Sequence, residues 1–206
     1  YQIKSVCILN PFIFKKIKSD SMIKTKKIYS KNTLRIISVG RLTIQKDFMT
    51  MLKAIKLIKK RKVELIIIGK GSEKNNLLKF IRNNNLSNNI RLIGYKKNPF
   101  KYIRQSEIFI LTSIFEGSPN VLIEAQYLKK YIISTNCPTG PREILNNGKY
   151  GSLVKIKDYK SIAKIIEKYN YGSAIKNKIK TGYLNTKRYD YQINCNKYYN
   201  LIKKLI

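Results

Sequence analysis

Residues 34–69, LRIISVGRLTIQKDFMTMLKAIKLIKKRKVELIIIG, place an amphipathic stretch between two short apolar runs. The runs Leu34–Val39 and Val63–Ile68 are rich in β-branched residues and predict buried strands. Between them, apolar side chains recur at helical spacing, at Phe48, Met51, Leu52, Ile55 and Ile58. The stretch therefore predicts a βαβ unit whose two strands lie parallel.

The same alternation continues along the rest of the chain. Further strands are predicted at 90–93, 108–111, 131–134 and 151–154, and helices at 73–84, 99–105, 120–128 and through the tail from about 160. This order predicts an α/β fold, a Rossmann-like parallel sheet with helices on both faces. Ligands bind such a sheet beyond the carboxyl ends of its strands. We therefore expect functional residues in the loops after Val39, Ile68, Ile93, Leu111 and Ser134.

The chain is strongly basic, with 43 Lys+Arg against 11 Asp+Glu and a formal net charge of +32. Such a surplus suggests nucleic acid or an anionic membrane as a partner. Most of the cations are Lys spread along the whole chain, whereas nucleic-acid readers cluster Arg for bidentate contacts. We therefore interpret the charge mainly as Lys on solvated faces, within a composition that is also rich in Asn, Ile and Tyr.

The composition also excludes several kinds of site. The sequence has no His, which excludes a Ser-His-Asp triad and a His-ligated zinc within it. Cys7, Cys137 and Cys195 lie far apart and form no Cys-x-x-Cys pair. Their spacing indicates a reducing compartment, with neither a disulfide framework nor a metal site.

The loop after the first predicted strand carries two cations. Gly40 allows the backbone to approach a ligand closely, and Arg41 and Lys46 follow it at the same strand end. Two cations there could hold a diphosphate and neutralise its charge as it departs. The alternative is that they are two more surface cations in a basic chain. Asp47 can cap the helix that follows.

The turn Gly69-Lys70-Gly71-Ser72 follows the second predicted strand and opens a helix. Backbone N–H groups at such a turn can bind an anion or a ribose. The alternative is a turn that serves only tight packing of strand against helix, and the third Gly of the dinucleotide fingerprint is missing.

Two of the scarce acidic residues lie beyond the predicted strand 108–111. In the run 115–125, FEGSPNVLIEA, Glu116 precedes a predicted helix and Glu124 lies within it. The N–H groups of Asn120 and Val121 would face out of the helix N-terminus, where a phosphate is favoured. Glu124 would lie a turn deeper and could accept hydrogen bonds from vicinal hydroxyls. The alternative is a capping Glu followed by a salt-bridged helical Glu.

Together these motifs resemble the family-4 retaining glycosyltransferases. The resemblance rests on the run Val39–Leu42 with Lys46, on Gly69-x-Gly71, and on the paired glutamates within 115–125. In addition, Cys137–Ile144, CPTGPREI, is similar to a signature of bacterial surface-polysaccharide and lipid-linked oligosaccharide members. The resemblance implies a GT-B fold, in which two Rossmann-like domains face each other across a cleft. One departure is Gln126–Tyr131, where the family usually has a Gly- or Pro-containing turn.

The resemblance covers about residues 1–170 and corresponds to the C-terminal, nucleotide-sugar-binding half of the family. We therefore expect residues 1–31 to be a linker from an N-terminal domain that would precede Tyr1. Residues 32–170 would form the nucleotide-sugar-binding Rossmann-like domain, and residues 171–206 would form C-terminal helices.

The resemblance implies a role for each matching residue. Arg41 and Lys46 would bind the donor diphosphate and stabilise the leaving nucleoside diphosphate. Glu116 would hold hydroxyls of the donor sugar near the reacting carbon, and Glu124 would bind the ribose. The remaining donor-binding residues would be Gly40, Gly69, Gly71, Gly94, Tyr95, Gly117, Ser118, Asn120 and Val121, with Gly94 and Tyr95 bordering the base.

The implied reaction transfers a sugar from a nucleotide sugar, with uridine as the expected base, to a glycan or polyprenyl-linked acceptor. Retention by same-face attack is preferred over a covalent intermediate on Glu116. The sequence has no Asp-x-Asp, so no metal or other cofactor is expected, and Arg41 and Lys46 would replace a metal at the diphosphate. We expect a cytoplasmic protein of surface-polysaccharide or oligosaccharide biosynthesis, in peripheral contact with an anionic inner membrane.

Two other hypotheses remain open from the sequence. The chain could be a basic Rossmann-like module that holds nucleic acid through its Lys surface, or an inactive glycosyltransferase fragment. The first predicts tight binding that falls steeply with salt, whereas the enzyme predicts saturable nucleotide-sugar binding. No specific nucleic-acid partner is expected.

Overall fold

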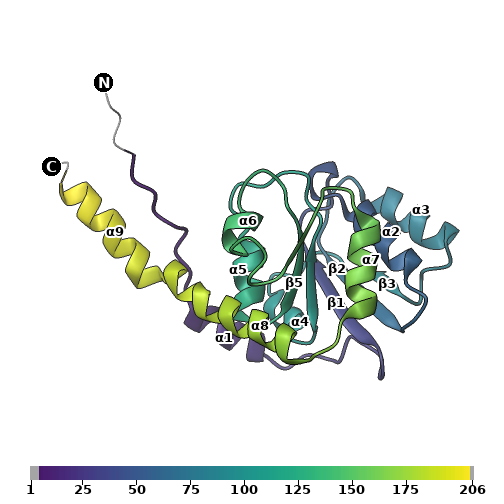
Figure 1. The fold of residues 1–206 in the computed structure, drawn as a ribbon. Helices are drawn as coiled ribbons and strands as arrows, with labels where there is room; N and C mark the ends of the chain where they lie inside the picture. Colours follow the sequence, from purple (N-terminus) through teal and green to yellow (C-terminus); the bar gives the residue numbers. More distant parts are fainter. Residues whose placement is uncertain (1–4, 205–206) are drawn as a thin grey trace.

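The computed structural model describes residues 5–204, so the first four residues of the expected linker and the last two of the tail lie outside it. Its centre is a parallel sheet with the spatial strand order β3-β2-β1-β4-β5-β6 (Figure 1). The strands are β1 (Leu34–Val39), β2 (Val63–Ile68), β3 (Ile90–Leu92), β4 (Ile108–Leu111), β5 (Tyr131–Thr135) and β6 (Ser152–Val154). The predicted α/β fold is confirmed, and each predicted strand differs from the observed one by at most one residue at either end.

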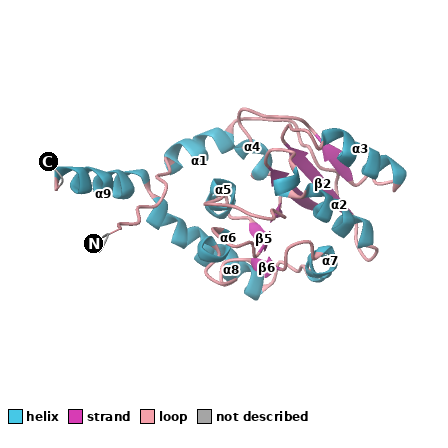
Figure 2. Ribbon diagram, turned by 90° about the horizontal axis from the view of Figure 1, so that it is seen from above, coloured by secondary structure: helices cyan, strands magenta, loops and turns pink. Residues whose placement is uncertain are grey.

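Helices cover both faces of the sheet (Figures 1 and 2). One face packs against α2 (Phe48–Leu57), α3 (Lys74–Asn83) and α7 (Tyr159–Lys168), and the other against α1 (Phe14–Met22), α4 (Phe100–Ile103), α5 (Asn120–Tyr127) and α6 (Pro141–Ile144). On β1, Ile36 belongs to the first core and Ile37 to the second, and both are fully buried. Each such side chain stabilises the fold by about 1.5–3 kcal/mol. Burial on both faces explains why the strands are mostly apolar and show no polar–apolar alternation.

Part of the expected linker packs into the domain. The backbone N–H of Phe12 donates to the carbonyl of Tyr189 at 2.8 Å, and its ring stacks on Phe14. Phe12 and Ile17 are both buried in the core on the α4 and α5 side of the sheet. Residues 5–31 therefore contain a helix and core side chains, whereas their connection to a preceding domain stays a prediction.

Two local features of the helices bear on the sequence predictions. Asp47 caps α2 as predicted: its Oδ1 accepts from the Thr50 N–H at 3.2 Å, and its Oδ2 accepts from the Thr50 hydroxyl at 2.7 Å. At the end of α5, in the segment Gln126–Tyr131 that departs from the expected pattern, Lys129 adopts φ +56°. The N–H of Lys130 then bonds to the carbonyl of Ala125 at 3.0 Å, so this departure still closes the helix.

The tail is helical, as predicted. It comprises α8 (Ser173–Asn185), a 3₁₀ turn η2 (Thr186–Tyr189) and α9 (Tyr191–Lys203). Figure 1 shows α9 extending away from the sheet. Within the part of the chain that the structure describes, no helix combines the length and apolar character needed to cross a membrane.

Candidate functional site

The carboxyl ends of all six strands meet at one edge of the sheet. β1 lies between β2 and β4, so the chain changes direction across the sheet at β1 and β4. Ligands of doubly wound sheets bind at such a switch point. The loop after β1 carries Arg41 and Lys46, and the loop after β4 carries Glu116. The three predicted catalytic residues therefore come from adjacent strands at this position.

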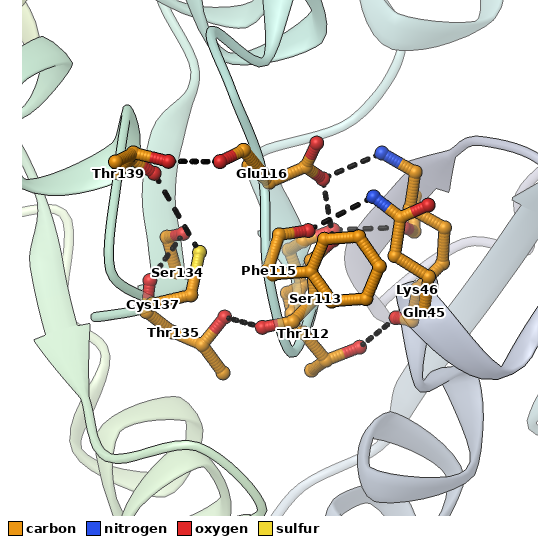
Figure 3. A network of polar contacts seen from close by, with 12 residues as sticks. Gln45, Lys46, Thr112, Ser113, Phe115, Glu116, Ser134, Thr135, Cys137 and Thr139 are labelled. Atoms are coloured by element: carbon orange, nitrogen blue, oxygen red, sulfur yellow. Dashed lines mark hydrogen bonds and ion pairs between the residues drawn. The ribbon is translucent and has the colours of Figure 1, made fainter.

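Lys46 and Glu116 contact each other directly. The 3₁₀ turn η1 (Ile44–Lys46) brings the Nζ of Lys46 to 2.5 Å from the Oε1 of Glu116 (Figure 3). The hydroxyl of the buried Ser113 donates to the same oxygen at 2.6 Å. The two charged side chains are only 15% and 7% exposed. Oε1 is thus held by two donors, while no other described residue forms a hydrogen bond with Oε2.

Hydrogen bonds join the two loops on either side of this ion pair. The hydroxyl of Thr112 donates to the carbonyl of Lys46 at 3.1 Å, and the N–H of Ile114 donates to the carbonyl of Gln45 at 2.8 Å. The amide of Gln45 in turn donates to the carbonyl of Phe115 at 2.9 Å. The backbone positions of the cation and the carboxylate are therefore fixed relative to each other (Figure 3).

The run Cys137–Ile144 supports Glu116 from the opposite side. The hydroxyl of Thr139 donates to the carbonyl of Glu116. Gly140 has φ +83°, and a Cβ there would lie 2.3 Å from the carbonyl oxygen of Gly117. The sequence predicted no role for the residues of this run, and it did not predict a role for Ser113. Two features of the sequence could have indicated these roles. They are the turn Gly140-Pro141 and the hydroxyl of Ser113, three residues before Glu116.

The glycines of the neighbouring loops are explained by close backbone packing. A Cβ on Gly69 would lie 1.9 Å from the carbonyl oxygen of Gly40, and one on Gly71 would lie 2.3 Å from that of Leu42. The N–H of Gly69 donates to the carbonyl of Gly94 at 3.1 Å. The loops after β1, β2 and β3 thus pack against one another. This supports the packing alternative for Gly69 and Gly71, and a donor-binding role for them stays a prediction.

Glu124 lies one turn into α5 and is half-buried. Within residues 5–204, its carboxylate has no hydrogen bond or ion pair with another side chain. Burial raises the pKa of Glu124 from 4.5 to about 7. A carboxyl group with no partner and a raised pKa is typical of functional sites, because a bound ligand can supply the missing hydrogen bonds.

The other predicted site residues lie at the surface of this edge. Arg41 is exposed, and its side chain forms no hydrogen bond or ion pair with the described residues. Tyr95 is 64% exposed, with the Nζ of Lys70 5.7 Å from its ring centre. The Oδ1 of Asn120 accepts from the amide of Asn10 at 3.0 Å. The structure leaves Gly117 and Ser118 exposed and Val121 half-buried.

Residues 20–180 match the model of a protein family described as glycosyl transferases group 1. The chain belongs to this family. Its six-stranded sheet is the Rossmann-like fold found in GT-B glycosyltransferases.

Two curated relatives illustrate the similarity in sequence. An uncharacterized glycosyltransferase of Methanocaldococcus jannaschii is 41% identical over 140 residues, which cover 61% of this chain and 34% of the relative. The N-acetylgalactosamine-N,N'-diacetylbacillosaminyl-diphospho-undecaprenol 4-alpha-N-acetylgalactosaminyltransferase of Campylobacter jejuni is 33% identical over 150 residues, 71% of this chain and 41% of the relative. The matched part of the chain thus spans about two fifths or less of these relatives.

Solved structures show the same fold. A glycosyltransferase from Rickettsia africae superposes with a TM-score of 0.84 at 21% identity, covering 97% of this chain and 56% of that one. The structure of Anabaena Alr3699/HepE in complex with UDP-glucose also superposes with a TM-score of 0.84. Its sequence identity is 18%, and the match covers 95% of this chain and 57% of that one.

Proposed function

We propose that this chain is the donor-binding half of a family-4 retaining glycosyltransferase, which transfers a sugar from a UDP-sugar to a glycan or polyprenyl-linked acceptor. The observation that carries the proposal is the fixed Lys46–Glu116–Ser113 cluster at the switch point of the sheet. The Campylobacter relative, by its name, acts on a diphospho-undecaprenol-linked sugar, and the Anabaena structure contains UDP-glucose. The first supports a polyprenyl-linked acceptor, and the second supports a UDP-sugar donor.

In the proposed mechanism, the donor diphosphate lies between Arg41 and Lys46. The bond between the anomeric carbon and the phosphate oxygen breaks, and its electron pair stays on the diphosphate, whose growing charge the two cations stabilise. The acceptor oxygen attacks the anomeric carbon on the same face, and its proton passes to the departing phosphate. The free Oε2 of Glu116 accepts from a sugar hydroxyl and orients the donor.

The proposed partners are therefore the nucleotide sugar and a glycan or polyprenyl-linked acceptor, the latter bound by a second domain outside this sequence. No metal or other cofactor is assigned a role, because Arg41 and Lys46 carry the charge at the diphosphate. Peripheral contact with an anionic membrane on the cytoplasmic side is proposed from the Lys surplus and a lipid-linked acceptor.

Titration calorimetry of the chain with UDP-glucose, UDP-N-acetylglucosamine, GDP-mannose and a short DNA duplex tests this proposal. We expect saturable binding of a UDP-sugar. Its dissociation constant should change little between salt concentrations of about 50 and 200 mM. Binding of the duplex alone, with a steep loss at higher salt, would instead favour the nucleic-acid hypothesis.

The affinity for a UDP-sugar should rise with pH, because an ionised Glu124 accepts hydrogen bonds from both ribose hydroxyls and binds them more strongly than the protonated acid does. Its pKa of about 7 in the free protein means that the carboxyl is mostly protonated at pH 6 and mostly ionised at pH 8. The ionised fraction, and with it the association constant, should grow about tenfold over that range. Calorimetry with UDP-glucose, whose diphosphate keeps the same charge between pH 6 and pH 8, measures this at several pH values, and Glu124→Gln should give a flat profile. An equal rise in wild type and Glu124→Gln would remove Glu124 from the site.

Ser113→Ala should weaken binding of a UDP-sugar more than binding of UDP. Ser113 donates to the Oε1 of Glu116 and so orients a carboxylate that we assign to the sugar. Because this bond is present with and without the ligand, the cost to binding is that of a less well oriented carboxylate, about 1 kcal/mol or roughly fivefold in sugar-dependent affinity. Comparison of UDP-glucose with UDP in wild type and Ser113→Ala measures that difference. The assignment fails if both ligands lose the same affinity.

A further inference from the structure

A separate hollow of about 660 Å³ lies at the other end of the sheet, beside the amino ends of β1 and β4. Its walls are the segment 21–33, the first residues of β1, and α4 with the turn that follows it. Pockets for small ligands have volumes of roughly 300–1,000 Å³. Of the described residues that line it, none belongs to the candidate donor site.

The walls of this hollow are fixed by hydrogen bonds. The amide of Gln105 accepts from the N–H of Ile28 at 3.1 Å and donates to the carbonyl of Lys26 at 3.3 Å. The buried Glu64 accepts from the N–H of Ser30 at 3.1 Å, and the hydroxyl of Tyr29 donates to a β1 carbonyl at 2.8 Å. The segment is therefore held against the sheet without any ligand.

The lining of the hollow is dominated by cations. It contains a single carboxylate, Glu107, against six cations, namely Lys24, Lys27, Lys31, Arg35, Lys101 and Arg104. Glu107 is already engaged, since its Oε2 accepts from both the Nε and the N–H of Arg35 at 3.1 Å. The side chains of the other five form no hydrogen bond or ion pair within the described residues. A concave wall with charge of one sign concentrates the field at its centre.

A seventh cation lies behind this wall. The Nζ of Lys130 donates to the carbonyls of Arg104 and Ser106, at 2.8 and 2.7 Å. Burial lowers the pKa of Lys130 to about 8, and the charges of Arg35 and Arg104 add to the effect. Positive charge is therefore crowded at this end of the sheet, and an anion in the hollow would relieve the repulsion.

The kind and arrangement of the cations, rather than their number, distinguish this hollow from the basic surface elsewhere. A second hollow, of about 520 Å³ between β6 and α7, also contains lysines, but its carboxylate Asp158 caps α7 and its walls include no Arg. Of these two hollows, the first contains guanidinium groups, which match phosphate oxygens with paired N–H donors, and a wall fixed by hydrogen bonds. The side chain of Arg104 is unpaired within the described residues, whereas Arg35 is paired with Glu107.

We propose that the hollow between residues 21–33 and α4 binds an anion with two or more phosphate charges, such as a diphosphate. Lys101 in α4 and Arg104 at the end of α4 contact the anion from one side of the hollow. Lys24 and Lys27 contact it from the facing segment 21–33. The source is either a soluble phosphate compound or a lipid headgroup. The proposal does not depend on the donor site.

Calorimetry of the chain with inorganic pyrophosphate at about 150 mM salt tests this site. Saturating UDP-glucose is present to occupy the proposed diphosphate site at Arg41 and Lys46, and the test protein is the double variant Lys101→Gln/Arg104→Gln. The matched control is Lys164→Gln/Lys168→Gln, which removes two lysines from the second hollow. The carbonyl of Arg104, which Lys130 contacts, is retained in the variant, and thermal melting checks that both proteins fold. We expect the first variant to lose at least tenfold in affinity and the control to match wild type, with UDP-glucose binding equal in all three.

A second arm identifies the source of the phosphate. The lipid probe is a vesicle containing cardiolipin, whose headgroup carries two phosphates, and the control vesicle is phosphatidylcholine alone. Co-sedimentation with the cardiolipin vesicles only, which the first variant loses, supports the site with a lipid headgroup. Pyrophosphate binding that the first variant loses, without such co-sedimentation, supports it with a soluble ligand. Equal losses in the two double variants, or no loss in either assay, would overturn the proposal, because the attraction would then be general to the Lys surface.

Discussion

Lys46→Met should remove most of the affinity for a UDP-sugar and also destabilise the fold. The side chain of Lys46 is the cation closest to Glu116 and, in our proposal, a ligand of the diphosphate. Loss of a charge-assisted contact of this kind should cost about 1.5–3 kcal/mol, or roughly 10- to 150-fold in the dissociation constant. In addition, the variant leaves the carboxylate of Glu116, which is 7% exposed, without its cation. Breaking a buried pair in this way lowers the free energy of unfolding by about 3–5 kcal/mol.

A double-mutant cycle separates the two effects. The variant Lys46→Met/Glu116→Gln contains no unpaired buried charge, so its urea midpoint should recover toward that of wild type. Its affinity for UDP-glucose should stay low, because the diphosphate ligand is still missing. Arg41→Gln is the matched control for stability, since Arg41 is exposed and unpaired within the described residues. That variant should weaken donor binding without shifting the urea midpoint.

Wild-type affinity for UDP-glucose in both Lys46→Met and Arg41→Gln would contradict the proposed role of the loop after β1. Low affinity in Lys46→Met that recovers together with stability in the double variant would also contradict it. In that case the ion pair would serve only to hold the two loops together.

The sequence was sufficient to predict the sheet, because a parallel sheet buried on both faces needs continuous apolar strands. Val63–Ile68 is buried at every position, and its short length and β-branched residues favour a strand over a buried helix. The strand ends then located Lys46 and Glu116 at one edge of the sheet. Their direct pairing was not predictable, since it depends on how η1 turns between residues that are 70 positions apart.

Two further features depended on tertiary contacts that leave little trace in the sequence. Phe12 and Ile17 stand among lysines and show no clear periodicity, and the surfaces that bury them are formed by distant segments such as Tyr189. Thr139 supports Glu116 across two different loops, so its role appears only once β4 and β5 lie side by side. The local sequence pattern therefore predicted the strands and helices. The residues that support the site could be identified only once these strands and helices were packed together.

Gly69→Ala should be one of the most destabilising single substitutions at this edge of the sheet. Its Cβ would lie 1.9 Å from the carbonyl oxygen of Gly40 and 3.0 Å from the carbonyl carbon. Both obstacles are backbone atoms, and the N–H of Gly40 is itself bonded to the carbonyl of Ile68 at 3.0 Å. Relief therefore requires the loop after β1 to move away from β2. We expect a loss of about 3 kcal/mol in the free energy of unfolding, at the upper end of the usual cost of overpacking.

Gly117→Ala is the matched control, because a Cβ at Gly117 meets no atom within 4 Å. Its free energy of unfolding should change by less than about 0.5 kcal/mol, as is usual for an exposed position. Urea unfolding of the two variants at one pH gives the comparison, and equal midpoints would refute the packing explanation of Gly69. Donor binding then distinguishes the roles of the two glycines. If Gly69 acts through packing, its variant should lose affinity together with stability, whereas a fully stable Gly117→Ala that binds UDP-glucose weakly would place the ligand against the open face of Gly117.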